Sequence, residues 1–160
     1  MLKGMTQDFG EGLITLDINP ERNPDVVWDL ENLPLPFSDE IFNEIHMYQV
    51  LEHLGGPGDY KQFFGFFEEL WRISRPGCFV FISVPAPESI WAWGDPSHKR
   101  VIPATQFQFL SQEFMREECE VKKTSASDFR YMYKADFKII VYNNDNECSN
   151  LVLEAIKPGV

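Results

Sequence analysis

A helix signal placed between two strand signals constrains the fold of this chain more than any other feature. The helix signal starts at Asp59, with Gln62 three residues later as in a capping box, and its apolar residues recur at three-, four- and seven-residue spacing. It stops at residues 75–77 (RPG), because proline cannot extend a helix. Strand-like segments stand on either side, at 44–50 (EIHMYQV) and 78–84 (CFVFISV). This alternation predicts an α/β sheet, and the unbroken apolar run at 78–84 predicts a strand covered by helices on both faces.

The segments around this unit extend the same pattern. Residues 13–16 (LITL) and 26–30 (VVWDL) read as two earlier strands, and residues 104–118 as a second helix. Near the end of the chain, 137–142 and 150–156 flank the turn-forming NNDN and predict an antiparallel hairpin. We therefore expect one domain over residues 1–160. Its fold would be α/β and Rossmann-like, with a mostly parallel sheet, helices on both faces and a C-terminal antiparallel β-hairpin.

Charge and composition limit the classes of partner. The 160 residues carry a formal net charge of -11, which repels nucleic acid phosphates and anionic membrane surfaces. We expect a small-molecule or protein partner, and neither nucleic acid nor membrane. Three cysteines without CxxC spacing argue against a disulfide framework or a structural zinc site. With neither a signal-peptide pattern nor an apolar run of ~20 residues, the expected location is cytoplasmic.

Polar residues follow three of the expected strands. Asp17 follows the first strand, Asp29 lies near the end of the second, and residues 49–53 (QVLEH) close the third. In open α/β sheets the ligand crevice lies outside the carboxyl ends of the strands. Two acids there could bind the ribose and the adenine of a cofactor. Aspartate is also a common first residue of a loop, so position alone leaves both interpretations open.

Four longer stretches together resemble a known family. They are LDINP, DVVWDLENLPLPFSDEIFNEIHMYQVLEHL, FFEELWRISRPGCFVFISVP and DPSHKRVIPATQFQFLS. Their order and spacing resemble those of the class I S-adenosylmethionine-dependent methyltransferases, over roughly residues 12–114. The resemblance implies that fold, S-adenosylmethionine as cofactor, and methyl transfer to an acceptor that the sequence does not identify.

The resemblance also implies roles for individual residues. Asp17 would bind the ribose hydroxyls and Ile18 would pack on the adenine. Asp29 would accept a hydrogen bond from the adenine amine, with the backbone of Leu30 nearby. Gln49 would border the methionine end of the cofactor.

The glycine loop of the family would fall on Gly4, Met5 and Thr6. Gly4 is the one glycine of the usual pair, and Thr6 adds a Cβ where the backbone approaches the cofactor. This departure supports an alternative function, a catalytically inactive methyltransferase-like domain that binds or regulates a partner. A nicotinamide-dependent oxidoreductase would need a G-x-G-x-x-G turn, which the sequence lacks.

Two histidines are candidates for catalysis. His53, next to Glu52, could act as a general acid or base, or the pair could hold a divalent metal. We favour capping and packing over a metal and predict no metal site. His98, in the long loop after residue 84, is either a residue of the acceptor pocket or a surface histidine. Trp91 and Trp93, in the same loop, could line a pocket or a contact between two copies in a homodimer.

Overall fold

The computed structural model describes residues 12–158, so Gly4 and the expected glycine loop lie outside the described part of the chain. The elements in chain order are β1 (Leu16–Asp17), η1 (Pro20–Arg22), β2 (Val26–Val27), β3 (Phe42–Tyr48), η2 (Leu51–His53), α1 (Tyr60–Ile73), β4 (Ser74–Pro85), α2 (Trp91–Gly94), α3 (Thr105–Gln108), α4 (Gln112–Arg116), η3 (Glu117–Val121), β5 (Phe137–Asn144) and β6 (Cys148–Ala155).

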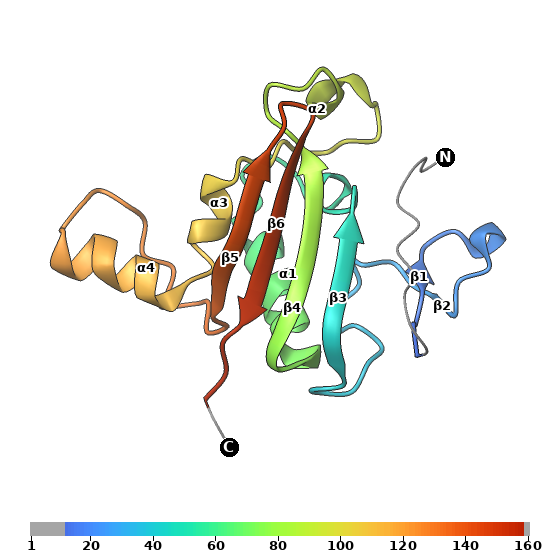
Figure 1. Ribbon diagram of the computed structural model, residues 1–160, viewed down its shortest axis with the longest axis horizontal. Helices are drawn as coiled ribbons and strands as arrows, with labels where there is room; N and C mark the ends of the chain where they lie inside the picture. The colour runs from blue at the N-terminus through green and yellow to red at the C-terminus, as the bar shows by residue number, and fades with distance from the viewer. Residues whose placement is uncertain (1–11, 159–160) are drawn as a thin grey trace.

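Four strands form the main sheet, in the order β3-β4-β6-β5 (Figure 1). β3 and β4 pair in parallel, as expected for strands joined by a helix. β6 pairs antiparallel with both β4 and β5, so β3, β4 and β5 run in one direction and β6 runs against them. The predicted C-terminal antiparallel hairpin is confirmed.

Helices cover one face of this sheet, and the prediction of helices on both faces is wrong for residues 12–158. In Figure 1 α1 lies behind the strands and the near face is uncovered. The burial along β4 alternates accordingly: Val80 and Ile82 are 0% and 2% exposed, whereas Phe79 is 39% exposed. An apolar residue on the open face makes the strand look doubly buried in sequence, because hydrophobic residues can also lie at the surface.

The helix α1 builds the core against the covered face. Its start is the predicted one, since the Asp59 carboxylate accepts a hydrogen bond from the Gln62 amide at 3.1 Å. Its apolar residues point at the sheet, and Phe67 is fully buried. The buried residues of the helix are Phe63, Phe64, Phe66, Phe67, Leu70 and Ile73.

A second, two-stranded sheet stands apart from the first. β1 pairs in parallel with β2, and in residues 12–158 neither hydrogen-bonds to the main sheet. Both strands are two residues long, shorter than the segments 13–16 and 26–30 that the sequence predicts. Thr15 adds bonds at one end of the pair: its amide and its hydroxyl both donate to the Asp25 carboxylate, at 2.8 and 2.7 Å, while its carbonyl accepts from the Val26 amide at 3.0 Å.

The second predicted helix, residues 104–118, is broken. α3 ends at Gln108 and α4 begins again at Gln112, with Ser111 as its N-cap. No helix in the described residues is both long enough and apolar enough to span a membrane.

Candidate active site

The first two acids of the predicted site lie on neighbouring strands. The register of the small sheet pairs Asp17 with Val27, and the Trp28 amide donates to the Asp17 carbonyl at 3.0 Å. Asp29 follows directly. The parallel pairing therefore brings Asp17 and Asp29 to the same edge, at the carboxyl ends of β1 and β2.

Both carboxylates also shape the loops that follow them. Asp17 Oδ1 accepts a hydrogen bond from the Asn19 amide at 2.8 Å, and Asp29 Oδ1 accepts one from the Glu31 amide at 2.9 Å. These are Asx turns, which position a carboxylate at the start of a loop and engage one oxygen. The loop-starter interpretation of both acids is thus correct, and it is compatible with ligand binding by the second oxygen.

Ile18 and Leu30 each follow one of these acids in the sequence, and they differ in exposure. Ile18 is 65% exposed, which leaves its side chain accessible to a flat ring. Leu30 is partly buried and lines a cavity of about 600 Å³ together with Val50, the residue after Gln49.

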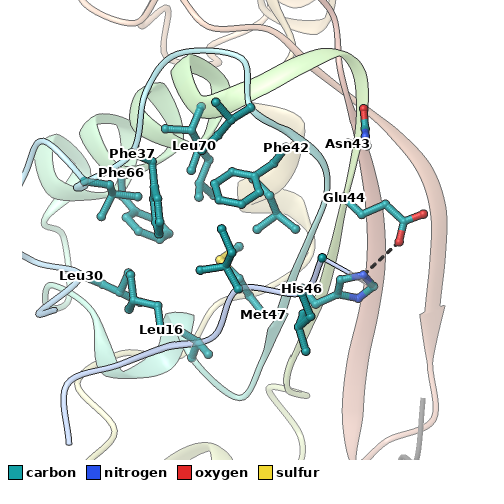
Figure 2. A pocket seen from close by; sticks show the side chains of 18 residues that line it. Leu16, Leu30, Phe37, Phe42, Asn43, Glu44, His46, Met47, Phe66 and Leu70 are labelled. Atoms are coloured by element: carbon teal, nitrogen blue, oxygen red, sulfur yellow. Dashed lines mark hydrogen bonds and ion pairs between the residues drawn. The ribbon is translucent and has the colours of Figure 1, made fainter. Parts of the chain in front are cut away.

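This cavity lies between β1 and β3 (Figure 2). Residues 42–47 of β3 form one wall, residues 12–14 and Leu16 another, and Phe66 and Leu70 of α1 the floor. β3 pairs with β4 on one side only, so in the described chain its other edge is unpaired and faces this space. Most residues that line the cavity are apolar, and the cavity runs alongside the strand.

Gln49 has a strained backbone at the carboxyl end of β3. Its φ is 56°, a left-handed conformation that non-glycine residues rarely adopt and that concentrates at functional sites. Its amide donates to the Ser83 carbonyl at 2.8 Å, and its side-chain Nε2 donates to Ser83 Oγ at 3.3 Å. The side chain is held over the end of β4, and the family resemblance implies the methionine end of the cofactor at this residue.

The structure brings His53 and His98 together, although 44 residues separate them in the sequence. The loop that carries His98 is held on η2, because the amides of Lys99 and Arg100 both donate to the Glu52 carbonyl, at 2.8 and 3.3 Å. The two imidazole rings meet edge to face with centroids 4.8 Å apart.

Glu52 completes this cluster. Its carboxylate Oε1 lies 4.0 Å from Nε2 of His98, and the side chain is 1% exposed. Burial raises the pKa of the Glu52 carboxyl group, because the charged form loses its hydration. The sequence indicated Glu52 and His53 as neighbours, but only the folding of the 95–100 segment onto η2 shows that His98 joins them.

One residue links the two halves of the site. Glu31, just after the β2 loop, accepts from the Gly55 amide at 2.7 Å and pairs with Lys99 Nζ at 2.8 Å. The Lys99 ammonium lowers the pKa of the Glu31 carboxyl group. The sequence analysis missed this residue, which is the one ionic connection in the described chain between the Asp29 loop and the His98 loop. No hydrogen bond or ion pair joins Asp17 or Asp29 directly to either histidine there.

Comparisons with solved structures found proteins with a similar arrangement of the backbone. A SAM-dependent methyltransferase from Archaeoglobus fulgidus matches with a TM-score of 0.54 and 12% identity, over 87% of this chain and 74% of that protein. The N-methyltransferase NodS from Bradyrhizobium japonicum matches with a TM-score of 0.49 and 11% identity, over 89% of this chain and 72% of that protein. A SAM-dependent methyltransferase from Methanosarcina mazei matches with a TM-score of 0.46 and 13% identity, over 88% of this chain and 80% of that protein.

The fold assignment depends on the first of these matches. No protein-family model and no curated protein matches the chain. At these identities the likeness concerns the arrangement of the backbone and leaves the chemistry of individual residues open. The chain therefore has the class I S-adenosylmethionine-dependent methyltransferase fold.

Proposed function

We propose that this protein is an S-adenosylmethionine-dependent methyltransferase that acts on a small-molecule or protein acceptor. The observation that carries the proposal is the parallel pairing of β1 with β2, which brings Asp17 and Asp29 together at the carboxyl ends of two strands in a methyltransferase fold. That edge of an open α/β sheet is where such folds bind ligands.

The residues at this edge fit the cofactor. Asp17 would hold the ribose hydroxyls, and Asp29 would accept a hydrogen bond from the adenine amine. In each aspartate, the Asx turn uses Oδ1, so the second carboxylate oxygen would bind the cofactor. The exposed Ile18 would pack on the adenine beside the Leu30 backbone, and Gln49 would border the methionine portion. When bound, S-adenosylmethionine supplies a methyl group on a positively charged sulfur.

The task of the chain is then to orient an acceptor and to exclude water. Alignment of the reacting atoms supplies most of what such a displacement needs. His53 and His98 lie beyond the carboxyl end of β3, where one of them could take a proton from an acceptor that must lose one.

Exposed apolar side chains form a surface on the loop that also carries His98. Ile90, Trp91 and Trp93 are 76%, 58% and 69% exposed, on and just before α2, which lies beyond the carboxyl end of β4 (Figure 1). Tryptophan at a surface favours contact with an apolar ligand or a protein. This surface and the net charge of -11 favour those two acceptor classes over nucleic acid. A contact between two copies through Trp91 and Trp93 stays a prediction.

A second candidate function is binding without catalysis. The unpaired edge of β3 and the cavity beside it favour this function, because the sheet is discontinuous between β1 and β3 in the described chain. In that case the domain would present its surfaces to a partner and would not need the cofactor.

Calorimetric titration with S-adenosylmethionine and S-adenosylhomocysteine separates the two candidates. For the enzyme we expect micromolar binding that Asp17→Ala weakens by more than ~10-fold, the loss expected when a charge-assisted hydrogen bond of about 1.5–3 kcal/mol disappears. Asp17→Asn is a sharper variant, because it can keep the turn to Asn19 while it loses the charge.

Asp128→Ala serves as the matched control, since Asp128 is an exposed aspartate whose partner is Arg130 and which takes no part in the site. A folded wild-type protein that gives no heat with either ligand would exclude the enzyme for this chain. Equal weakening by Asp17→Ala and Asp128→Ala would exclude the assigned ribose site.

A further inference from the structure

We propose that Glu52, His53 and His98 form a binding site for a divalent transition metal ion of the Zn²⁺ type. Ligand atoms of the three side chains lie within 4.8 Å of one another. The proposal concerns ion binding and does not depend on methyl transfer.

The first argument is the state of the Glu52 carboxylate. The side chain is 1% exposed, and neither Oε1 nor Oε2 has a hydrogen-bond partner within the described chain. Burial of a carboxylate without such a partner is costly, and buried charges in proteins are paired or coordinate metals. In the described residues, this carboxylate therefore has no positive group within hydrogen-bond distance.

Neither of the two nearby basic side chains, Lys99 and Arg100, hydrogen-bonds to the Glu52 carboxylate, and Arg100 Nε is itself without a partner in the described residues. The buried guanidinium of Arg100 lies over the Phe63 ring, 5.2 Å from its centroid, and donates towards Gln106 Oε1 at 3.4 Å. Lys99 pairs with Glu31. In residues 12–158, His98 is the one basic group within 4.0 Å of the Glu52 carboxylate.

The second argument is the orientation of the two imidazoles. His53 Nδ1 lies 3.2 Å from the Ser97 carbonyl, which can only accept, so Nδ1 carries the proton and the neutral ring has its lone pair on Nε2. Metal-binding histidines are typically fixed in this way by a backbone carbonyl. The imidazole of His98 is 7% exposed, and its Nδ1 has no hydrogen-bond partner in the described chain.

The local charge also favours a cation. Asp95 starts the loop that carries His98, and its Oδ1 accepts hydrogen bonds from the Ser97 amide and hydroxyl, at 2.8 and 2.5 Å. The Asp95 carbonyl accepts a hydrogen bond from the His98 amide at 3.1 Å, so this acidic residue lies beside the cluster.

The donor set indicates the class of metal. Two imidazoles and one carboxylate are a common ligand set of zinc sites that leave one position open. A tetrahedral site with bonds of about 2.0–2.2 Å places its ligand atoms about 3.3–3.6 Å apart. Because His98 Nε2 lies 4.0 Å from Glu52 Oε1, side-chain rotations that close this gap by about half an ångström would bring the two to that spacing.

The test is metal binding by chelator-treated protein, measured with Zn²⁺ by calorimetry and with Co²⁺ by its visible absorption. For the wild type we expect one ion per chain and the absorption bands of a four-coordinate Co²⁺ site. Glu52→Gln and His98→Gln should each weaken binding by more than ~10-fold. Glu52→Gln should fold at least as well as the wild type, because it removes a buried charge.

The third histidine of the chain provides the control. His46 lies on β3, pairs with Glu44 at 3.2 Å and stacks on Phe81, so His46→Gln should leave the metal affinity unchanged. Absence of binding by the wild type would overturn the proposal. So would equal weakening by His46→Gln, or binding that survives in both Glu52→Gln and His98→Gln. Each readout can succeed whether or not the protein binds S-adenosylmethionine.

Discussion

The main sheet and the β1–β2 pair are held together in different ways. In the main sheet, residues 79–83 of β4 are paired with β3 on one side and with β6 on the other, and the covered face of the strand packs on the phenylalanines of α1. The small pair has two residues in each strand, and none of the four is fully buried. Stability therefore resides in one region, while the acids assigned to the cofactor lie on the other. Binding residues are often placed on the less stable parts of a fold, because those parts can adjust to a ligand.

The contrast between the two regions predicts that truncation of a core side chain lowers the stability of the protein much more than truncation of a side chain in the β1–β2 pair. Phe67 is fully buried, with the rings of Phe63, Phe107 and Phe137 at 5.0 to 6.1 Å between centroids. Phe67→Ala should lower the free energy of unfolding by about 3–5 kcal/mol. Val27→Ala, on the exposed side of β2, should change it by less than about 0.5 kcal/mol. Urea denaturation measures both, and equal costs would contradict the division of stability.

A smaller loss of stability is expected on replacement of Arg72, which hydrogen-bonds the segment after β2 to the core. Arg72 of α1 donates to the carbonyls of Leu35 and Phe37, at 3.1 and 2.8 Å, and pairs with Asp39 and Glu69. Arg72→Met keeps the stem of the side chain and removes all of these bonds. It should cost about 1–3 kcal/mol in the same denaturation experiment.

The exposed Arg22 on η1 provides the matched variant for that experiment. Arg22→Met should leave the midpoint unchanged, because surface substitutions have little effect on stability. If Arg72→Met also left the denaturation midpoint unchanged, the segment after β2 would be held on the core by its apolar side chains alone.

The smallest effect should be confined to the β1–β2 pair. The hydrogen bonds from Thr15 lower the pKa of the Asp25 carboxyl group below its ordinary 3.8. A group whose pKa is depressed by folding stabilises the structure above its unfolded pKa and loses that contribution as the pH falls through the folded value. Amide protection around Thr15 and Val26 should therefore decrease below about pH 4.

Asp25→Ala should remove the same protection at neutral pH and leave the global unfolding midpoint unchanged. Hydrogen exchange resolved by residue measures this. A pH-independent protection of Thr15, or a shift of the whole transition, would show that the small sheet folds with the core as one unit.

Sequence reasoning succeeded where local signals are sufficient. The start of α1 and the C-terminal hairpin follow from capping, periodicity and turn residues, all within a few positions. The helix expected at 104–118 failed for a tertiary reason. Residues between its halves bond to distant segments, as when the Phe137 amide and the Tyr133 hydroxyl both donate to the Leu110 carbonyl.

In the candidate site, too, local sequence signals predict some of the contacts, and others depend on tertiary structure. Asp17 and Asp29 could be predicted to meet, because each closes a short strand and parallel strands end at one edge. The grouping of Glu52 with His98, and the salt bridge of Glu31 with Lys99, depend on how the 95–100 loop folds onto η2. That contact spans more than 40 residues, and no local signal in the sequence predicts it.

The unpaired edge of β3 also affects how molecules of this protein behave in concentrated solution. Within residues 12–158 this seven-residue strand has one open edge, and such an edge is a template for pairing with a second molecule, which proteins commonly protect with charge. Glu44 supplies that charge on β3, and the net charge of -11 keeps copies apart at neutral pH. As acid neutralises the carboxylates near pH 4, both protections fade, and edge-to-edge aggregation should begin at this strand.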